Sequence, residues 1–185
     1  MDTMAYLAHK ATGLPKNRII GMGGALDSAR FKYRLAEALE CAQSDISAMV
    51  IGGHSDTGMV PLIDKAVRNS VPVTEFLSEE KQAEVVEATK VGGATLTKLL
   101  GTSAWYAPGA AVSELVRAIA LDSQKMFPCS ALLEGEYGLS DISIGAPCII
   151  GKNGIEKIVE IELSDAEKEK LTASAEGVSK VNALL

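Results

Sequence analysis

The segment Gly151-Lys152-Asn153-Gly154 constrains the fold more than any other part of the sequence. It divides residues 146–163 into two arms that both contain isoleucines. An Asn-Gly pair tolerates the positive φ angles of a tight turn, and such turns join antiparallel strands. In the second arm Val159, Ile161 and Leu163 alternate with two glutamates, which indicates one buried and one solvated face. The sequence therefore predicts an antiparallel sheet in this part of the chain.

Helical spacing of apolar residues is the second pattern in the chain. This spacing predicts helices over residues 2–12, 26–43, 79–100 and 108–123. Gly92-Gly93 lies inside the third of these and predicts a bend, because glycine weakens a helix interior. A fifth helix begins at Ser164, since Ser164 and Glu167 have the spacing of a capping box and apolar residues follow at helical spacing.

Short apolar runs predict the remaining strands. They cover residues 17–22, 48–51, 71–77 and 126–134. The chain contains no internal repeat and no low-complexity linker, so we expect one domain over residues 1–185. The predicted fold class is α+β, with long helices packed on a twisted, largely antiparallel sheet.

Charge and cysteine content narrow the function classes. The net charge is -6 and the pI is about 5.0, with scattered Lys and Arg residues, so a nucleic-acid partner is not expected. Cys41, Cys129 and Cys148 match neither a disulfide framework nor a zinc site. The start lacks a basic leader, and no segment has the length and apolarity of a membrane span. We therefore expect a cytoplasmic protein whose partner is a small molecule or another subunit.

Three chemically matched side chains lie close together in the sequence. Asp27 and Arg30 are three residues apart on a predicted helix and therefore share a face, and His54 follows a buried strand through Gly52-Gly53. Histidine gives and takes a proton near neutral pH, and an aspartate can fix its tautomer. Arginine can hold a carboxylate with two parallel hydrogen bonds. Together the three groups suit a small hydroxy acid.

Other interpretations of these residues stay open at the sequence level. A single histidine after a strand is often structural or exposed, and Asp27 with Arg30 is also compatible with an ordinary helix pair. Gly21-Met22-Gly23-Gly24 suggests a phosphate-binding turn but lacks the G-x-G-x-x-G spacing. A hydrolase that uses His54 and Asp27 is disfavoured, because no serine or cysteine nucleophile is placed beside them.

At these residues the chain resembles the carboxy-terminal, substrate-binding half of an NAD-dependent malate dehydrogenase of the lactate-dehydrogenase-like type. The likeness covers nearly the whole chain. Its matching stretches are Met4-Ala5-Tyr6-Leu7-Ala8 through Thr12-Gly13-Leu14-Pro15, Arg18-Ile19-Ile20-Gly21-Met22-Gly23-Gly24, Leu26-Asp27-Ser28-Ala29-Arg30-Phe31, Gly52-Gly53-His54, Met59-Val60-Pro61-Leu62 and Ser103-Ala104-Trp105-Tyr106-Ala107-Pro108-Gly109-Ala110-Ala111. Together these motifs are highly specific, although each alone is weak.

The resemblance implies a role for each site residue. His54 would be the proton donor and acceptor, Asp27 its carboxylate partner, and Arg30 the clamp on the carboxylate next to the reacting carbon. Ser103 and Ala104 fall where the family lines the substrate pocket. Ser55 stands where the resemblance implies a glycine after the catalytic histidine.

The resemblance also implies the function of the complete protein. It would convert malate and NAD to oxaloacetate and NADH, with this chain as the substrate half, and full-length relatives imply a homo-oligomer. The amino-terminal Rossmann half that binds NAD is expected to be absent, with Asp2 near the junction, so we expect little activity from the chain alone. The alternatives are a lactate or other 2-hydroxy acid dehydrogenase half, and a non-catalytic oligomerisation or carboxylate-binding module.

Overall fold

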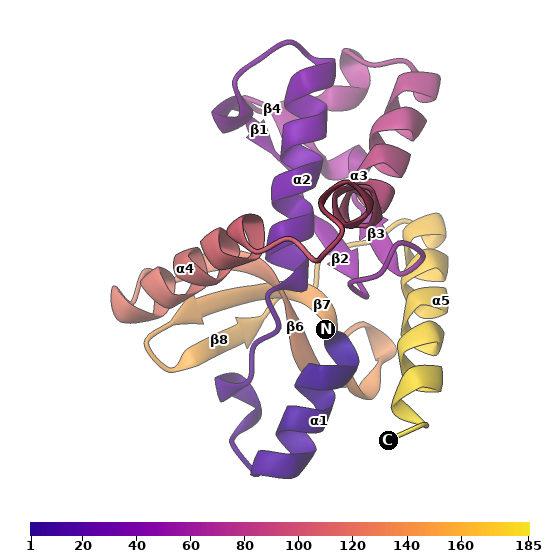
Figure 1. The fold of residues 1–185 in the computed structure, drawn as a ribbon. Coiled ribbons are helices and arrows are strands. Elements are labelled where there is room, and N and C mark those ends of the chain that lie inside the picture. The colour runs from indigo at the N-terminus through magenta and orange to yellow at the C-terminus, as the bar shows by residue number, and fades with distance from the viewer.

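The computed structural model describes all residues from 1 to 185 and contains five α-helices packed on antiparallel sheets (Figure 1). The helices are α1 (Asp2–Thr12), α2 (Gly23–Ala38), α3 (Glu79–Leu100), α4 (Tyr106–Ala120) and α5 (Asp165–Asn182). The strands are β1 (Ile46–Ser47), β2 (Val50–Gly52), β3 (Met59–Pro61), β4 (Val67–Arg68), β5 (Val71–Pro72), β6 (Lys125–Glu134), β7 (Ser140–Gly151) and β8 (Gly154–Ile158). The predicted fold class is confirmed.

The long strand β7 organises the larger, five-stranded sheet. It pairs with β6 along one edge and with β2 and then β8 along the other, while β3 pairs with β2. All these pairings are antiparallel. A second sheet of three short strands has the order β1-β4-β5. No helix of the chain combines the length and apolarity needed to cross a bilayer.

The predicted hairpin forms, but its second arm is shorter than the sequence pattern indicated. Gly154 has a φ of 97° and begins β8 directly after the turn. The strand ends at Ile158, so the alternating residues 159–163 are not part of the sheet. Leu163 is nevertheless buried, because it packs in a cluster with residues of α5. The alternation of apolar and charged residues therefore reflects which side chains are buried, although these residues do not form a strand.

Two other predicted strands were wrong for local reasons. Residues 17–22 form no strand, because a 3-10 turn covers Lys16–Arg18 and only Gly21 makes a bridge, to Ser130. Residues 71–77 contain only the two-residue strand β5, after which a 3-10 turn spans Val73–Glu75. Val73 and Leu77 are buried four residues apart, a spacing that belongs to one helical turn and not to an alternating strand.

Helix α2 links the two sheets. Figure 1 shows it running from the small sheet at the top of the view to the large sheet below. Its residues Phe31 and Leu35 are fully buried against β1, β2 and the start of α3, in the cluster that also contains Val50 and Val85. At its other end Leu26 packs with residues of β6 and β7. This packing fixes the position of every side chain that α2 presents between the sheets.

Helices α3 and α5 form largely as predicted. Ser164 accepts a hydrogen bond from the Glu167 backbone and the Glu167 side chain returns one to Ser164, so the capping box of α5 is confirmed. Helix α3 spans the predicted residues without a break in its assignment. In Figure 1 its first turns are seen from the side and its last turns end on, which agrees with the bend predicted at Gly92-Gly93.

Candidate active site

His54 and Asp27 form the centre of the candidate site. Asp27 lies in the second turn of α2, and His54 follows β2 by two residues. The imidazole Nδ1 is 2.6 Å from Asp27 Oδ2, and the two side chains are 24% and 2% exposed. An ionised carboxylate only accepts hydrogen bonds, so this contact places the proton on Nδ1 and leaves Nε2 free for chemistry. The predicted pairing of the two residues is therefore present in the structure.

Arg30 binds the other oxygen of the same carboxylate. Its Nη1 donates to Asp27 Oδ1 over 3.1 Å, and its side chain is 21% exposed. A carboxylate with only 2% exposure needs such partners, because an unpaired buried charge is strongly disfavoured. The structure shows no other protein hydrogen bond for the guanidinium, so its remaining N–H groups can meet an anionic ligand.

A buried serine locks the helix and the strand of the site together. Ser28 follows Asp27 in α2, and its Oγ accepts a hydrogen bond of 2.8 Å from the backbone N–H of Val50 in β2. Because β2 leads directly to His54, this bond fixes the carboxylate relative to the imidazole. Sequence reasoning did not single out Ser28, since a serine inside a helix carries no signal of the strand it will meet.

Glycines allow the close approach of elements at the site. A Cβ on Gly23 would lie 2.6 Å from Cβ and Cγ of His54, and one on Gly93 would lie 3.2 Å from Nη1 of Arg30. The sequence analysis considered Gly23 as part of a candidate phosphate-binding turn and Gly93 as a source of bending, and it assigned neither residue a contact with the site. In the structure Gly23 begins α2, and both glycines make room for a side chain of the site.

The glycine-rich segment 21–24 is not a phosphate-binding turn in this structure. A Cβ on Gly24 would lie 2.8 Å from the carbonyl oxygen of Pro128, and the corresponding position at Gly23 meets His54. The space that a pyrophosphate would need above these glycines is filled by the protein itself. The residues of this chain therefore do not form a dinucleotide site at this segment.

Ser103 and Ala104 lie in the loop between α3 and α4. Ser103 is exposed and Ala104 is half-buried. The structure shows no hydrogen bond between this loop and His54, Asp27 or Arg30. Their role in lining a substrate pocket stays a prediction.

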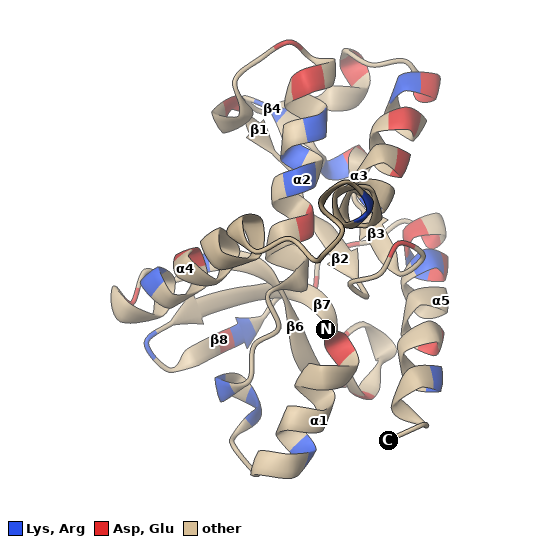
Figure 2. Ribbon diagram, in the orientation of Figure 1, with Lys and Arg blue, Asp and Glu red and all other residues tan.

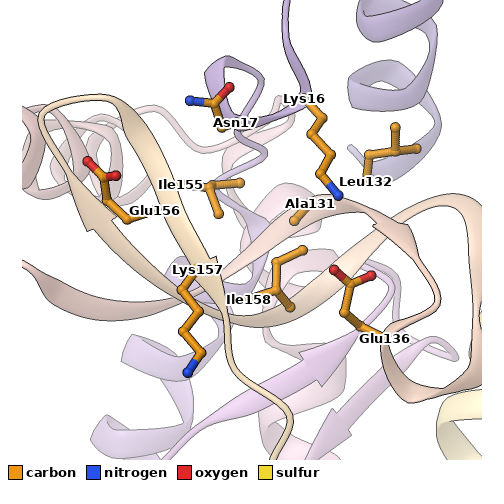
Figure 3. Close-up of a pocket in the computed structure, with 9 residues that line it drawn as sticks. All are labelled: Lys16, Asn17, Ala131, Leu132, Glu136, Ile155, Glu156, Lys157 and Ile158. Atoms are coloured by element: carbon orange, nitrogen blue, oxygen red, sulfur yellow. The ribbon is translucent and has the colours of Figure 1, made fainter.

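Arg30 also lines a cavity of about 410 Å³ between α2 and the later turns of α3. Leu26, Leu96 and Leu99 give this cavity apolar walls. A second cavity, of about 210 Å³, lies between β6, β8 and the turn at Lys16 (Figure 3). Charged side chains surround Ile155 and Ile158 there, but none of the three central residues takes part. Of these two cavities, only the first is lined by one of the three central residues.

Ser55 closes the turn that follows His54. Its Oγ accepts a hydrogen bond of 3.0 Å from the Gly58 backbone, and its own N–H donates to Gly53 O over 2.9 Å. Its φ is not positive, so the position does not require glycine. The serine at this position is therefore compatible with a tight turn.

Comparison with known proteins agrees with this fold. Residues 24–182 match the family model of the lactate/malate dehydrogenase alpha/beta C-terminal domain. A malate dehydrogenase from Bacteroides thetaiotaomicron is 64% identical over all 185 residues. The malate dehydrogenase structure from Aeropyrum pernix has a TM-score of 0.97 and 38% identity, with 100% of this chain and 61% of that one covered. A lactate dehydrogenase from Eimeria maxima, solved with NADH and oxamate, has a TM-score of 0.96 and 34% identity, with 100% of this chain and 57% of that one covered.

These relatives are longer than the chain. The chain covers 59% of the Bacteroides thetaiotaomicron enzyme. The match is therefore to a part of each relative, and it includes the segments that carry Asp27, Arg30 and His54. The chain belongs to the lactate/malate dehydrogenase family and corresponds to the alpha/beta C-terminal domain of that family.

Proposed function

We propose that this chain is the substrate half of an NAD-dependent malate dehydrogenase, which interconverts malate and oxaloacetate. The observation that carries the proposal is the shared carboxylate of Asp27, whose two oxygens hold His54 and Arg30 at 2.6 and 3.1 Å. An oriented imidazole beside a guanidinium suits proton transfer at the oxygen of a hydroxyl or carbonyl group whose carbon carries a carboxylate. The malate dehydrogenases among the relatives support malate as the substrate.

The residues of this chain would handle the substrate and its proton. Arg30 binds the carboxylate next to the reacting carbon. In the direction of oxidation, Nε2 of His54 takes the proton of the hydroxyl group, and the resulting imidazolium is stabilised by Asp27. In the reverse direction the same nitrogen returns the proton to the carbonyl oxygen. NAD, when bound, supplies the acceptor for the hydride that leaves the same carbon.

The cofactor would be held by a second polypeptide segment. The relatives are longer than this chain, and the glycines at 21–24 are packed against His54 and Pro128. We therefore expect the purified chain to show little or no turnover by itself. The cytoplasmic location expected from the sequence stays a prediction.

Complementation tests the proposal. The chain would be mixed with a separately expressed nucleotide-binding half of the Bacteroides thetaiotaomicron enzyme, and NADH formation from malate would be followed by absorbance. We expect turnover only in the mixture. Steady NADH production by the chain alone, or none in a mixture shown to associate, would refute the proposal.

The second candidate function is a non-catalytic carboxylate-binding module, which the free N–H groups of Arg30 favour. Calorimetry with oxamate would measure binding by the chain and by Arg30→Ala, with the exposed Arg117→Ala as the matched control. Both candidate functions predict that Arg30→Ala loses oxamate binding and that Arg117→Ala keeps it.

The complemented mixture distinguishes the candidate functions. Oxamate binding without turnover of malate would favour the carboxylate-binding module. Turnover of lactate in place of malate would identify a lactate dehydrogenase half.

A homo-oligomer is the partner that we propose for the chain. Residues 99–113 contain no charge, and Figure 2 shows the loop from α3 into α4 without charged residues. Several large apolar side chains of α3 and α4 are exposed, namely Leu99, Leu100, Trp105, Tyr106, Val112 and Val116. Exposed apolar side chains in such number favour association.

A further inference from the structure

The loop that carries His54 is bonded to a helix far away in the sequence. The hydroxyl of Ser174, in α5, accepts a hydrogen bond of 2.8 Å from the Gly53 backbone N–H. The same hydroxyl donates to the carbonyl oxygen of Gly58 over 2.8 Å. Ser174 is 5% exposed. One buried side chain therefore ties together both ends of the segment 53–58.

A second buried side chain holds His54 itself. Oδ2 of Asp2, the first residue of α1, accepts a hydrogen bond of 2.7 Å from the His54 backbone N–H. Asp2 is only 6% exposed, and a hydrogen bond to a carboxylate is shorter and stronger than one between neutral groups. The backbone of the histidine is thus fixed from α1, while its ring is fixed from α2 by Asp27.

The backbone of the loop is closely packed at Gly53. A Cβ on Gly53 would lie 3.1 Å from Cγ2 of Val178 and 3.3 Å from Oγ of Ser174. The backbone of the loop therefore lies directly against α5. Helices α1 and α5 also contact each other, so the two hydrogen bonds come from adjoining elements.

We propose that Asp2 and Ser174 are positioning residues that set the orientation of His54 toward Asp27. The proposal rests on the proposed function of His54 as the proton donor and acceptor. A reacting group must be held within a fraction of an ångström of its productive geometry, and backbone hydrogen bonds from rigid helices provide this. Neither side chain touches the substrate in this scheme, since each acts through the backbone beside the imidazole.

NMR of the chain tests the role of Ser174. The readouts are amide hydrogen exchange at Gly53 and the downfield proton resonance of the His54 Nδ1–H. In Ser174→Ala we expect Gly53 exchange to accelerate by about tenfold or more, because the buried donor loses its acceptor, and the Nδ1–H resonance to move upfield or broaden. Ser179→Ala, an exposed serine on the same helix, is the control and should leave both readouts unchanged.

The Asp2 variants provide an independent test. Asp2→Asn keeps an oxygen that can accept from the His54 N–H, whereas Asp2→Ala removes it. We expect Asp2→Ala to move the Nδ1–H resonance and Asp2→Asn to keep most of the parent signal. If Ser174→Ala does not fold, the comparison of Asp2→Ala with Asp2→Asn still tests whether hydrogen bonds to the loop backbone orient His54.

Two results would overturn the proposal. One is rapid exchange of the Gly53 and His54 amides in the parent chain. The other is a set of folded Ser174→Ala and Asp2→Ala variants that melt at lower temperature but keep the parent resonance, which is the signature of a purely structural role. The NMR readouts do not require turnover, so they test the positioning proposal separately from the proposed function. The NMR result can contradict the positioning roles although the complemented mixture oxidises malate, and it can support them although the mixture is inactive.

Discussion

At the residue scale, the two oxygens of the buried Asp27 carboxylate bind two different residues of the candidate site. Oδ2 faces the imidazole of His54, and Oδ1 faces the guanidinium of Arg30. In the proposed mechanism the carboxylate would orient His54 as the general acid and base and would stabilise its imidazolium, whereas Arg30 would bind the substrate directly. A change at Asp27 should therefore affect proton transfer more than binding.

We predict that Asp27→Asn lowers kcat of the complemented enzyme by roughly 10²-fold or more, the usual scale for loss of a general acid-base arrangement. The amide cannot stabilise an imidazolium by charge, and its NH2 group can select the wrong tautomer of His54. Steady-state kinetics would measure the loss. Asp56→Asn, exposed in the loop after His54, is the control and should keep parental kcat. Parental activity in Asp27→Asn would contradict the mechanism.

The cysteines provide a second prediction at this scale. Burial raises the pKa of the Cys148 thiol to about 12 and holds the pKa of Cys129 well above its ordinary value. At about pH 8 both remain protonated, and only the thiolate reacts with alkylating reagents. We expect iodoacetamide to label only the partly exposed Cys41 in the native chain and all three cysteines after unfolding. Mass spectrometry would count the labels, and rapid native labelling of Cys148 would contradict the packing.

At the scale of elements, α2 positions the site because its surface is shaped for three neighbours at once. Gly23 meets His54, Gly24 meets the backbone of β6 at Pro128, and Ser28 accepts a hydrogen bond from β2. A helix that began with larger residues could not approach both the strand and the histidine loop. The small residues Gly23, Gly24 and Ser28 therefore form the surface through which the helix contacts its neighbours.

A pair of glycine substitutions tests this reading of α2. We predict that Gly23→Ala destabilises the chain by about 1–3 kcal/mol, because the new methyl group overlaps His54. Gly177→Ala in α5 should stabilise it by about 0.4–1 kcal/mol, because its Cβ meets nothing within 4 Å and alanine favours the helix. Urea unfolding would give both values. Equal effects of the two substitutions would contradict the proposed close approach.

At the scale of the whole molecule, the first and the last helix both contact the loop that carries His54. Asp2 lies at the start of the described chain and Ser174 in its last helix, and both bind the segment that carries His54. The uncharged stretch of residues 99–113, from the end of α3 into α4, is a separate feature, and it is the one expected to meet another subunit.

This surface gives a prediction about association. We expect the chain to self-associate at high concentration, and the double variant Trp105→Ser with Val116→Ser to shift it toward the monomer, because both side chains are exposed and apolar. Analytical ultracentrifugation would measure the change. Val181→Ser, half exposed on α5, is the control. A parent chain that stays monomeric at high concentration would contradict the prediction.

The sequence determined the features that depend on neighbouring residues. The turn at Asn153-Gly154, the capping box at Ser164 and the helix over residues 79–100 all follow from local backbone preferences and appear as predicted. The shared face of Asp27 and Arg30 follows from helical geometry. The chemistry of the three side chains suggested that Asp27 pairs with His54, and the resemblance to the dehydrogenase family implied the same pairing.

Only the tertiary structure decided which distant groups meet. The hydrogen bonds of His54 with Asp2 and of Gly53 with Ser174 join residues 52 and 121 positions apart. No periodicity along the chain records such contacts, because they form only when the hydrophobic clusters fix the helices against the sheet. Local preference therefore sets the elements, and packing among them sets the geometry of the site.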